Sequence, residues 1–197
     1  PIGSFGEIFD VLLKKIQDLE GEVYLSTSVK RIITVDGQAT GMEVSQGELT
    51  EKKDFDVIIA TTPTFVFSKL VPELPRAYID NLMDVNYMSA VLLILVLSRP
   101  LSDVYWLNVA DRSIPFVGVV EHTNLIGSEY YSGKRIVYLS NYVGKDHPIY
   151  EMGHEELLKE YLPHIRKINP EFSLSWVETS YHHKVDAAQP IIGVNYS

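Results

Sequence analysis

A short apolar segment that stops abruptly at two threonines and a proline constrains the fold more than any other part of this sequence. Residues 55–60 read Phe-Asp-Val-Ile-Ile-Ala and are followed directly by Thr61, Thr62 and Pro63. A continuous apolar run of this length is typical of a parallel strand buried on both faces, whose carboxyl end faces a ligand-binding crevice. We therefore expect residues 1–75 to contain part of a doubly wound α/β sheet.

The first 25 residues predict a helix followed by a second strand of that sheet. Ser4 and Glu7 form a capping-box pattern at the helix start, and Gly21 ends the helix. The apolar residues that follow the cap at helical spacing are Ile8, Leu12, Ile16 and Leu19. Residues 23–25 read as a short strand, and we expect them to lie beside residues 57–60 in parallel.

An Asp-Gly pair predicts a hairpin between these two strands. Asp36 and Gly37 lie in the middle of residues 29–44, and this dipeptide favours a tight type I′ turn between antiparallel strands. Residues 65–82 then show a helical pattern. Two prolines interrupt it, Pro72 and Pro75.

The remainder of the sequence predicts a different architecture. Strands are expected at residues 89–97, 104–109, 116–122, 135–143 and 172–183. One helix is expected at residues 151–168, kinked or divided at Pro163. The apolar run at residues 90–97 indicates a strand buried on both faces. We therefore expect a mixed-sheet α+β domain with covering helices at residues 76–197, after the α/β portion.

Charge and cysteine content exclude several classes of protein. The formal net charge of −9 argues against binding to nucleic acid or to an anionic membrane surface. The sequence has no cysteine, which excludes disulfides and thiolate metal sites and fits a reducing, cytoplasmic location. Residues 90–97 are too short to span a membrane, so we expect at most attachment at the membrane periphery.

Five short motifs follow one another in a fixed order through residues 3–63. They are the turn Gly3-Ser4-Phe5-Gly6, the strand at residues 23–25, the step Val29-Lys30-Arg31-Ile32, the hairpin from Gly37 to Gly41, and the strand of residues 56–63. This series resembles a stretch of the flavin-containing amine oxidases, phytoene desaturases and protoporphyrinogen oxidases. Near the other end, Ala188-Gln189-Pro190 resembles the step before the last flavin-binding segment of that family. The chain thus looks like a central fragment of such an FAD-dependent oxidoreductase.

The resemblance implies an incomplete Rossmann-like FAD-binding portion followed by a substrate domain. In such proteins the residue matching Val29 holds the adenine through its backbone, and the strand end matching Ala60, Thr61 and Thr62 lies near the cofactor. Residues 84–183 would form the substrate domain, whose sheet covers the flavin. The reaction implied is hydride transfer to flavin from an amine or an unsaturated, lipid-like substrate.

One departure from the family pattern concerns the cofactor. The fingerprint G-x-G-x-x-G and its acidic ribose partner do not occur in this sequence. Without that loop and its helix N-terminus, the pyrophosphate of FAD has no cradle. We therefore expect this polypeptide alone to bind no flavin and to be inactive.

His122 and Asn124 are polar candidates at the end of a predicted strand. Alternation along the strand places Glu121 and His122 on opposite faces, so they do not act as a direct pair. His122 or Asn124 would contact substrate, or both would simply cap the strand end. Gln189 is a weaker candidate that rests on the resemblance alone.

A strand with hydroxyl groups on one face offers a second set of candidates. Tyr138, Ser140 and Tyr142 share that face, which suits either a substrate cavity with few polar anchors or a half-exposed sheet surface. For Trp106, core packing is the favoured role. Gly118 within a bulky strand indicates close packing or a close ligand.

No metal site and no hydrolase site is predicted. His182 and His183 point to opposite sides of a strand, and no His-x-x-x-His spacing occurs. No G-x-S-x-G elbow is present either. The expected partner is a small-molecule substrate, and exposed sheet edges favour a homodimer.

Two alternatives to the oxidoreductase stay open. One is a non-catalytic binding module of the same fold. The other is a flavin-dependent sugar-nucleotide mutase, which would need arginines converging on a diphosphate. The second half of the chain offers four scattered arginines, Arg99, Arg112, Arg135 and Arg166.

Overall fold

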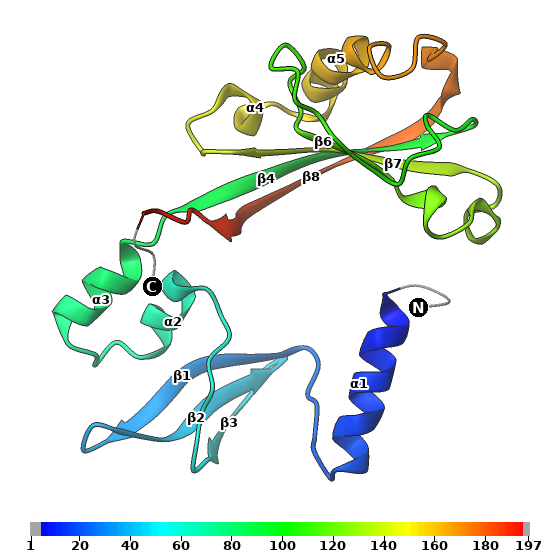
Figure 1. Ribbon diagram of the computed structural model, residues 1–197. Helices are drawn as coiled ribbons and strands as arrows, with labels where there is room; N and C mark the ends of the chain where they lie inside the picture. Colours follow the sequence, from blue (N-terminus) through cyan, green and yellow to red (C-terminus); the bar gives the residue numbers. More distant parts are fainter. Residues whose placement is uncertain (1–4, 195–197) are drawn as a thin grey trace. The chain divides into compact units, whose positions relative to one another are not determined.

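The computed structural model describes residues 5–194 and divides into two compact units at Asn86/Tyr87 (Figure 1). The boundary expected from the sequence, after residue 75, falls eleven residues earlier, immediately before helix α3 (Arg76–Met83). Each unit is described separately below.

The first unit contains a helix and a three-stranded antiparallel sheet. Helix α1 (Gly6–Asp18) lies within the predicted helical range, and Ser4 of the predicted capping box lies outside the described residues. The sheet has the order β1-β2-β3, with β1 at Thr27–Val35, β2 at Gln38–Gln46 and β3 at Leu49–Asp54. Asp36 and Gly37 have φ angles of 50° and 79°, as the central residues of a type I′ turn require. The predicted hairpin is confirmed, whereas β3 was not expected.

The predicted pair of parallel strands is wrong. Neither residues 23–25 nor residues 57–60 form a strand, and both described sheets consist of other segments. The side chains of Leu25, Val57 and Ile59 are 76%, 76% and 84% exposed. A parallel strand needs neighbouring strands and covering helices to bury such side chains, and the described residues provide neither for these segments. The Rossmann-like portion is therefore not seen directly.

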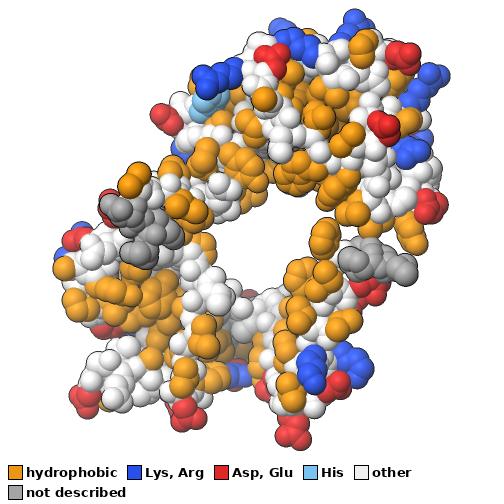
Figure 2. Space-filling model, viewed as in Figure 1, with side chains coloured by type: hydrophobic (Ala, Val, Ile, Leu, Met, Phe, Trp, Pro, Cys, Tyr) orange, Lys and Arg blue, Asp and Glu red, His pale blue; other side chains and the backbone are white. Residues whose placement is uncertain are grey.

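The apolar stripe of α1 is likewise uncovered. None of the residues of α1 is buried, and Phe9, Val11 and Leu12 are 68%, 68% and 53% exposed. Figure 2 shows hydrophobic side chains gathered along this helix. The predicted amphipathic pattern is present, but it is not used for packing within the first unit.

Two short helices complete the first unit, as the helical pattern at residues 65–82 predicted. They are α2 (Thr64–Leu70) and α3. Pro63 and Pro75 each stand directly before a helix, a place where a missing N–H costs nothing. Pro72 lies between the helices and separates them.

The second unit is built on a five-stranded sheet of order β5-β6-β7-β4-β8. The strands are β4 (Tyr87–Leu97), β5 (Trp106–Asn108), β6 (Gly118–Glu121), β7 (Arg135–Val143) and β8 (Val177–Pro190). Every strand pair in it is antiparallel, so the expected mixed sheet is instead purely antiparallel. The cause is the topology. The helical connection joins β7 to β8, and these two strands lie on either side of β4, so both run antiparallel to it.

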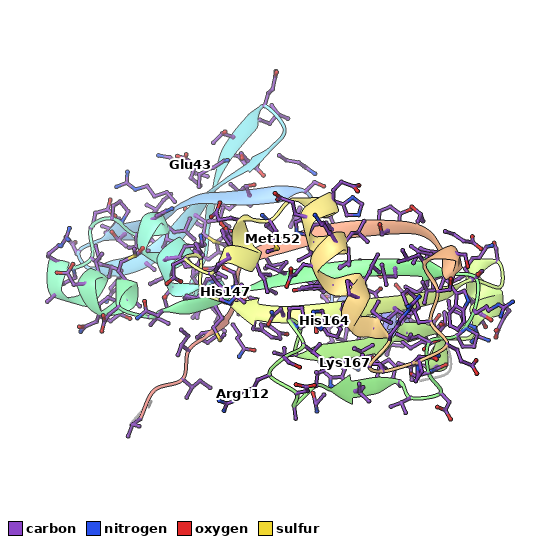
Figure 3. The ribbon with its side chains drawn as sticks, turned by 90° about the horizontal axis from the view of Figure 1, so that it is seen from above. Glu43, Arg112, His147, Met152, His164 and Lys167 are labelled. Carbon is purple, nitrogen blue, oxygen red and sulfur yellow. The ribbon has the colours of Figure 1, made fainter. Side chains whose placement is uncertain are left out.

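The helices of the second unit cover one face of this sheet. The expected helix at residues 151–168 is divided at Met152 and Gly153 into α4 (Pro148–Glu151) and α5 (His154–Ile165). Pro163 lies in the last turn of α5 and does not divide it. Figures 1 and 3 show both helices lying over the sheet on the same side. Short 3-10 helices occur at His122–Asn124, Ser128–Tyr131 and Leu174–Trp176.

The core lies between α5 and the covered face of the sheet. Fully buried strand residues include Val91, Leu93, Leu95, Val137 and Leu139. They pack against Leu157, Tyr161 and Ile165 of α5. Burial raises the pKa of the Tyr161 phenol to about 12, so this side chain stays neutral in the core.

Within residues 87–194, no α-helix lies over the opposite face of the sheet, and the 3-10 helix His122–Asn124 contacts this face at Tyr138. Leu92, Ile94 and Val96 are only half-buried, so the expectation that residues 90–97 are buried on both faces is wrong. We call this the open face and define it by the side chains Leu92, Ile94, Trp106, Val120, Tyr138, Ser140, Tyr142, Tyr181 and His183. Among residues 5–194, no helix is both long and apolar enough to cross a bilayer.

Candidate functional site

Three neighbouring residues of β7 form the centre of the open face. Tyr138, Ser140 and Tyr142 lie on one side of the strand because side chains alternate along it, and the alternate residues Val137, Leu139 and Asn141 are buried on the other side. Ser140 lies opposite Leu92 on β4 and opposite Gly118 on β6. Tyr142, at the end of this row, is 40% exposed. The predicted shared face is therefore present and carries aromatic and hydroxyl groups on an apolar floor.

Gly118 makes room for Ser140 on this face. A Cβ atom on Gly118 would lie 2.8 Å from Ser140 Oγ, closer than a Cβ atom approaches another heavy atom in a relaxed structure. The Ser140 hydroxyl also donates to the Gly118 carbonyl at 3.3 Å. The glycine is explained by strand packing, without a ligand.

Trp106 lies on the edge strand β5 and is 54% exposed. Its indole N–H donates to Asn108 Oδ1 at 2.9 Å. The expected role in core packing is wrong, because β5 is an edge strand with no covering element on this face. An exposed, hydrogen-bonded indole adds to the aromatic character of the open face.

His122 belongs to a cluster of phenol side chains. Its Nε2 atom lies 2.7 Å from the hydroxyl of Tyr131, and its ring makes edge contacts with Tyr131 and Tyr138 at centroid distances of 5.4 and 6.1 Å. Burial lowers the pKa of His122 below its usual value, which keeps the imidazole neutral at neutral pH. Burial also raises the pKa of Tyr138, as do the phenols of Tyr131 and Tyr105. His122 can therefore share a hydrogen bond with the Tyr131 hydroxyl while its own ring carries no charge.

Tyr131 was missed from the sequence. It lies in the 3-10 helix Ser128–Tyr131, nine residues after His122, and nothing in that segment signals the contact. Only the fold of the loop brings the two rings together.

Asn124 has a structural role in the same region. Its side-chain N–H₂ group donates to the carbonyl oxygens of Ser102 and Val104 at 2.9 and 3.1 Å. These contacts fit the polar cap that the sequence offered as the alternative role. They leave the amide oxygen of Asn124 as the group that can face a ligand.

Glu121 is a fully buried carboxylate that the sequence did not single out. It accepts hydrogen bonds from the backbone N–H of Leu101 at 3.1 and 3.2 Å and of Ser102 at 2.6 Å. Burial raises the pKa of Glu121, and the backbone hydrogen bonds partly oppose this rise. Strand alternation, which places Glu121 on the core side, was the signal that could have identified it.

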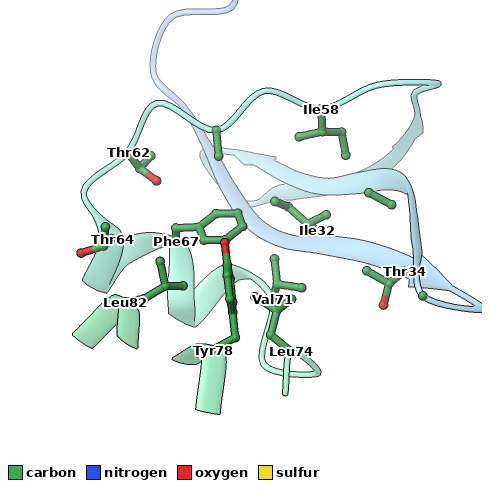
Figure 4. Close-up of a pocket in the computed structure, with 13 residues that line it drawn as sticks. Ile32, Thr34, Ile58, Thr62, Thr64, Phe67, Val71, Leu74, Tyr78 and Leu82 are labelled. Carbon is green, nitrogen blue, oxygen red and sulfur yellow. The ribbon is translucent and has the colours of Figure 1, made fainter. Parts of the chain in front are cut away.

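The predicted cofactor residues lie in two separate pockets of the first unit. Ala60 and Thr62 line a pocket of about 490 Å³, together with Ile32, Ile58 and Phe67 (Figure 4). Val29 lines a different pocket of about 450 Å³ with Met42 and Val44. Thr61 is exposed between its two neighbours. The structure thus brings Ala60 and Thr62 together and does not bring Val29 to them.

Within residues 5–194, these two pockets lack the groups that hold a pyrophosphate. Val29 lies on β1, an edge strand of the three-stranded sheet. The pocket of Ala60 and Thr62 is otherwise lined mainly by apolar side chains. Among the described residues, neither pocket has an arginine or a glycine-rich helix start to hold a pyrophosphate. The described residues therefore do not form a complete FAD site.

The structure is similar to three solved enzymes. It matches an oxidoreductase from Methanosarcina mazei with a TM-score of 0.71 and 19% identity, over 91% of this chain and 42% of that one. It matches a proposed protoporphyrinogen oxidase from Exiguobacterium sp. 255-15 with a TM-score of 0.64 and 13% identity, over 94% and 40%. A third match is reduced UDP-galactopyranose mutase, with a TM-score of 0.67 and 17% identity over 93% and 39%.

The predicted resemblance to protoporphyrinogen oxidase is confirmed at the level of the fold. The chain spans about two fifths of the length of each of these three structures. No protein-family model matches the sequence, and a search of curated proteins finds no match. This oxidase-like fold also occurs in the mutase, so the fold alone does not choose between the two activities.

The four arginines of the second unit lie in three different places. Arg99 and Arg135 line the same pocket at one end of the sheet. Arg112 lines another pocket and is labelled in Figure 3, and the Nε atom of Arg166 donates to the carbonyl of Phe172 at 3.1 Å. None of these four residues belongs to the open face.

The remaining candidates lie apart from the His122 cluster. Gln189 is exposed near the end of β8, opposite Met88. His183 lies on the open face opposite Leu92, while His182 lies opposite the core residue Leu93, so the two histidines point to opposite sides. Within the part of the chain that the structure describes, no group of three or more metal-ligating side chains occurs.

Proposed function

We propose that this chain is part of an FAD-dependent oxidoreductase and that the open face of its second unit holds the substrate. The observation that supports this proposal best is an uncovered sheet face that combines apolar strands with Trp106, Tyr138, Tyr142 and Tyr181. Small-molecule sites are mostly apolar and carry few polar groups. The likeness to a protoporphyrinogen oxidase agrees with this assignment.

The substrate class that suits this face is an amine or an unsaturated, lipid-like molecule. Aromatic rings offer a large apolar area with specific stacking geometry, and Ser140 and His183 supply isolated polar groups. The flavin, when bound, would accept a hydride from the substrate. This chain's own residues would orient the substrate and exclude water.

His122 is the better polar candidate at the end of the open face. Its neutral imidazole shares a hydrogen bond with Tyr131, so the pair can rearrange to accept or donate one hydrogen bond to a substrate. Asn124 has both amide hydrogens engaged, which makes it a weaker candidate. Gln189 remains a candidate on the basis of sequence resemblance only.

For the cofactor, we propose contacts from the backbone of Val29 and from Ala60, Thr61 and Thr62. These residues would touch FAD without enclosing its pyrophosphate. The chain of residues 1–197 on its own should therefore be colourless and inactive. A stable, stoichiometric flavin spectrum from this polypeptide would contradict that expectation.

The second candidate function is a flavin-dependent sugar-nucleotide mutase. The match to UDP-galactopyranose mutase favours it. The open face carries no arginine, whereas a diphosphate is best held by arginine, and this ranks the mutase below the oxidoreductase. A non-catalytic module of the same fold, and a homodimer formed through sheet edges, also stay as predictions.

The test uses the protein in its natural form, saturated with FAD. Amines, unsaturated lipids and a UDP-sugar are each added without oxygen while the visible absorption of the flavin is recorded. We expect bleaching by an amine or an unsaturated lipid, and we expect Tyr142→Ala to slow this bleaching more than Tyr130→Ala, which lies outside the open face. Conversion of the UDP-sugar without bleaching by any other compound would instead support the mutase.

A further inference from the structure

A polar pocket of about 550 Å³ lies at one end of the five-stranded sheet, apart from the open face. Its lining includes Arg99, Ser102, Asn124, Arg135 and Trp176. Arg135 pairs with Leu97 across β7 and β4, and Leu97 belongs to the covered core. The pocket shares no lining residue with the open face, although Asn124, the weaker polar candidate for substrate contact, also lines it.

Two arginines of this pocket have no acidic partner. Among residues 5–194, no carboxylate lies within ion-pair distance of Arg99 or Arg135. Burial raises the pKa of Glu121, and the charge of Arg135 is among the effects that oppose this rise, but the oxygens of Glu121 accept hydrogen bonds from the backbone. The N–H groups of both guanidinium groups are thus available to a ligand.

Trp176 fixes the position of Arg99. The guanidinium carbon of Arg99 lies 5.7 Å from the centre of the Trp176 ring, within the range of a cation–π contact. Trp176 is in turn held by the buried Phe172, at a centroid distance of 5.8 Å. A guanidinium beside a ring still has N–H donors for a planar anion.

Side-chain hydrogen bonds hold the backbone of Leu101 and Ser102, which line the pocket after Arg99. Glu121 binds the N–H groups of Leu101 and Ser102. Asn124 binds the carbonyl of Ser102, and Asn169 donates to the carbonyl of Leu101 at 2.8 Å. A loop fixed in this way loses little further entropy when a ligand binds.

We infer that Arg99 and Arg135 form a binding site for a small oxyanion, either a phosphoryl or a carboxylate group. Arginine forms paired hydrogen bonds with both groups. Two carboxylates, Asp103 and Glu171, also line the pocket, so its side-chain charges cancel. The net charge of −9 also repels anions at a distance. Affinity must therefore come from direct contact with the two guanidinium groups.

The test is isothermal titration calorimetry of the protein in its natural form with pyrophosphate and, separately, with citrate, at matched ionic strength. We expect at least one probe to bind with a dissociation constant of roughly 1 mM or below. Arg99→Gln and Arg135→Gln should each weaken binding about tenfold or more. Arg112→Gln, an exposed arginine of the same unit in another pocket, is the matched control and should leave binding unchanged.

The carboxylates provide an independent arm that does not remove either arginine. Asp103→Asn and Glu171→Gln should each strengthen binding several-fold, because each removes a like charge from the ligand's surroundings. Preference for pyrophosphate or citrate distinguishes a phosphoryl from a carboxylate ligand. The inference is overturned if neither probe binds, or if binding responds to Arg112→Gln but not to changes at Arg99, Arg135, Asp103 or Glu171.

Discussion

Replacement of Glu121 by alanine should destabilise the second unit strongly. The change leaves the N–H groups of Leu101 and Ser102 without their acceptor in a region where Glu121 itself is fully buried. Each unsatisfied buried donor costs about 1–3 kcal/mol, and the lost side chain leaves a cavity. Relief from burying a charge offsets part of this cost, so we expect a net loss of roughly 2–4 kcal/mol.

The assay is urea unfolding followed by the fluorescence of Trp106 and Trp176. The control is Glu155→Ala, because the Glu155 side chain is 90% exposed and its removal should change the free energy of unfolding by less than about 0.5 kcal/mol. A loss below about 1 kcal/mol for Glu121→Ala would refute the assigned role.

The raised pKa of Glu121 also determines how the free energy of unfolding should change with pH. Burial raises the pKa of folded Glu121 above its ordinary value of 4.5, so between these two pKa values the folded state binds more protons than the unfolded state. Its contribution to the free energy of unfolding is therefore full below pH 4.5 and declines as the pH rises through the folded pKa. Glu121→Gln cannot titrate, so the stability difference between wild type and this variant should shrink as the pH rises from 4.5 toward neutral. A difference that grows over this range would contradict the assignment.

Three further predictions concern single contacts. Gly118→Ala should cost up to about 1 kcal/mol in urea unfolding, because the new Cβ would meet Ser140 Oγ at 2.8 Å and the hydroxyl would have to rotate away. Ser140→Ala should relieve this cost in the double variant, and additive effects would contradict the contact. Gly37→Ala should cost about 1 kcal/mol, because its φ is +79°, and an unchanged midpoint would exclude the type I′ turn. The imidazole of His122 should titrate below 6.5 by NMR, and Tyr131→Phe should alter its ring shifts; a midpoint above 6.5 would show that burial does not control it.

Features that depend on local sequence patterns alone were predicted correctly in both units. The strand at Arg135–Val143 has the predicted bounds, and the turn at Asp36 and Gly37 has the predicted backbone angles. Both depend on neighbouring residues only: alternation of side chains in one case, and tolerance of positive φ in the other.

Predictions that depended on distant partners were less successful. Residues 57–60 have the composition of a buried parallel strand, but a strand forms only where other strands accept its hydrogen bonds. Conversely, β3 was not predicted because its sequence is mostly charged. Charged side chains are common on edge strands, and in the structure even Leu49 of this strand is 79% exposed.

In the candidate site too, local patterns were predictable and contacts between distant segments were not. The shared face of Tyr138, Ser140 and Tyr142 followed from alternation alone. Tyr131 and the backbone partners of Glu121 could not be predicted, because these contacts join loops that approach one another only in the folded chain.

A crystal structure of the natural protein with FAD and a bound substrate analogue would test the central claim most directly. The account predicts that the analogue contacts Tyr138, Ser140 and Tyr142 on the uncovered side of β7. An analogue bound beneath α4 and α5, or one that contacts none of these side chains, would contradict it.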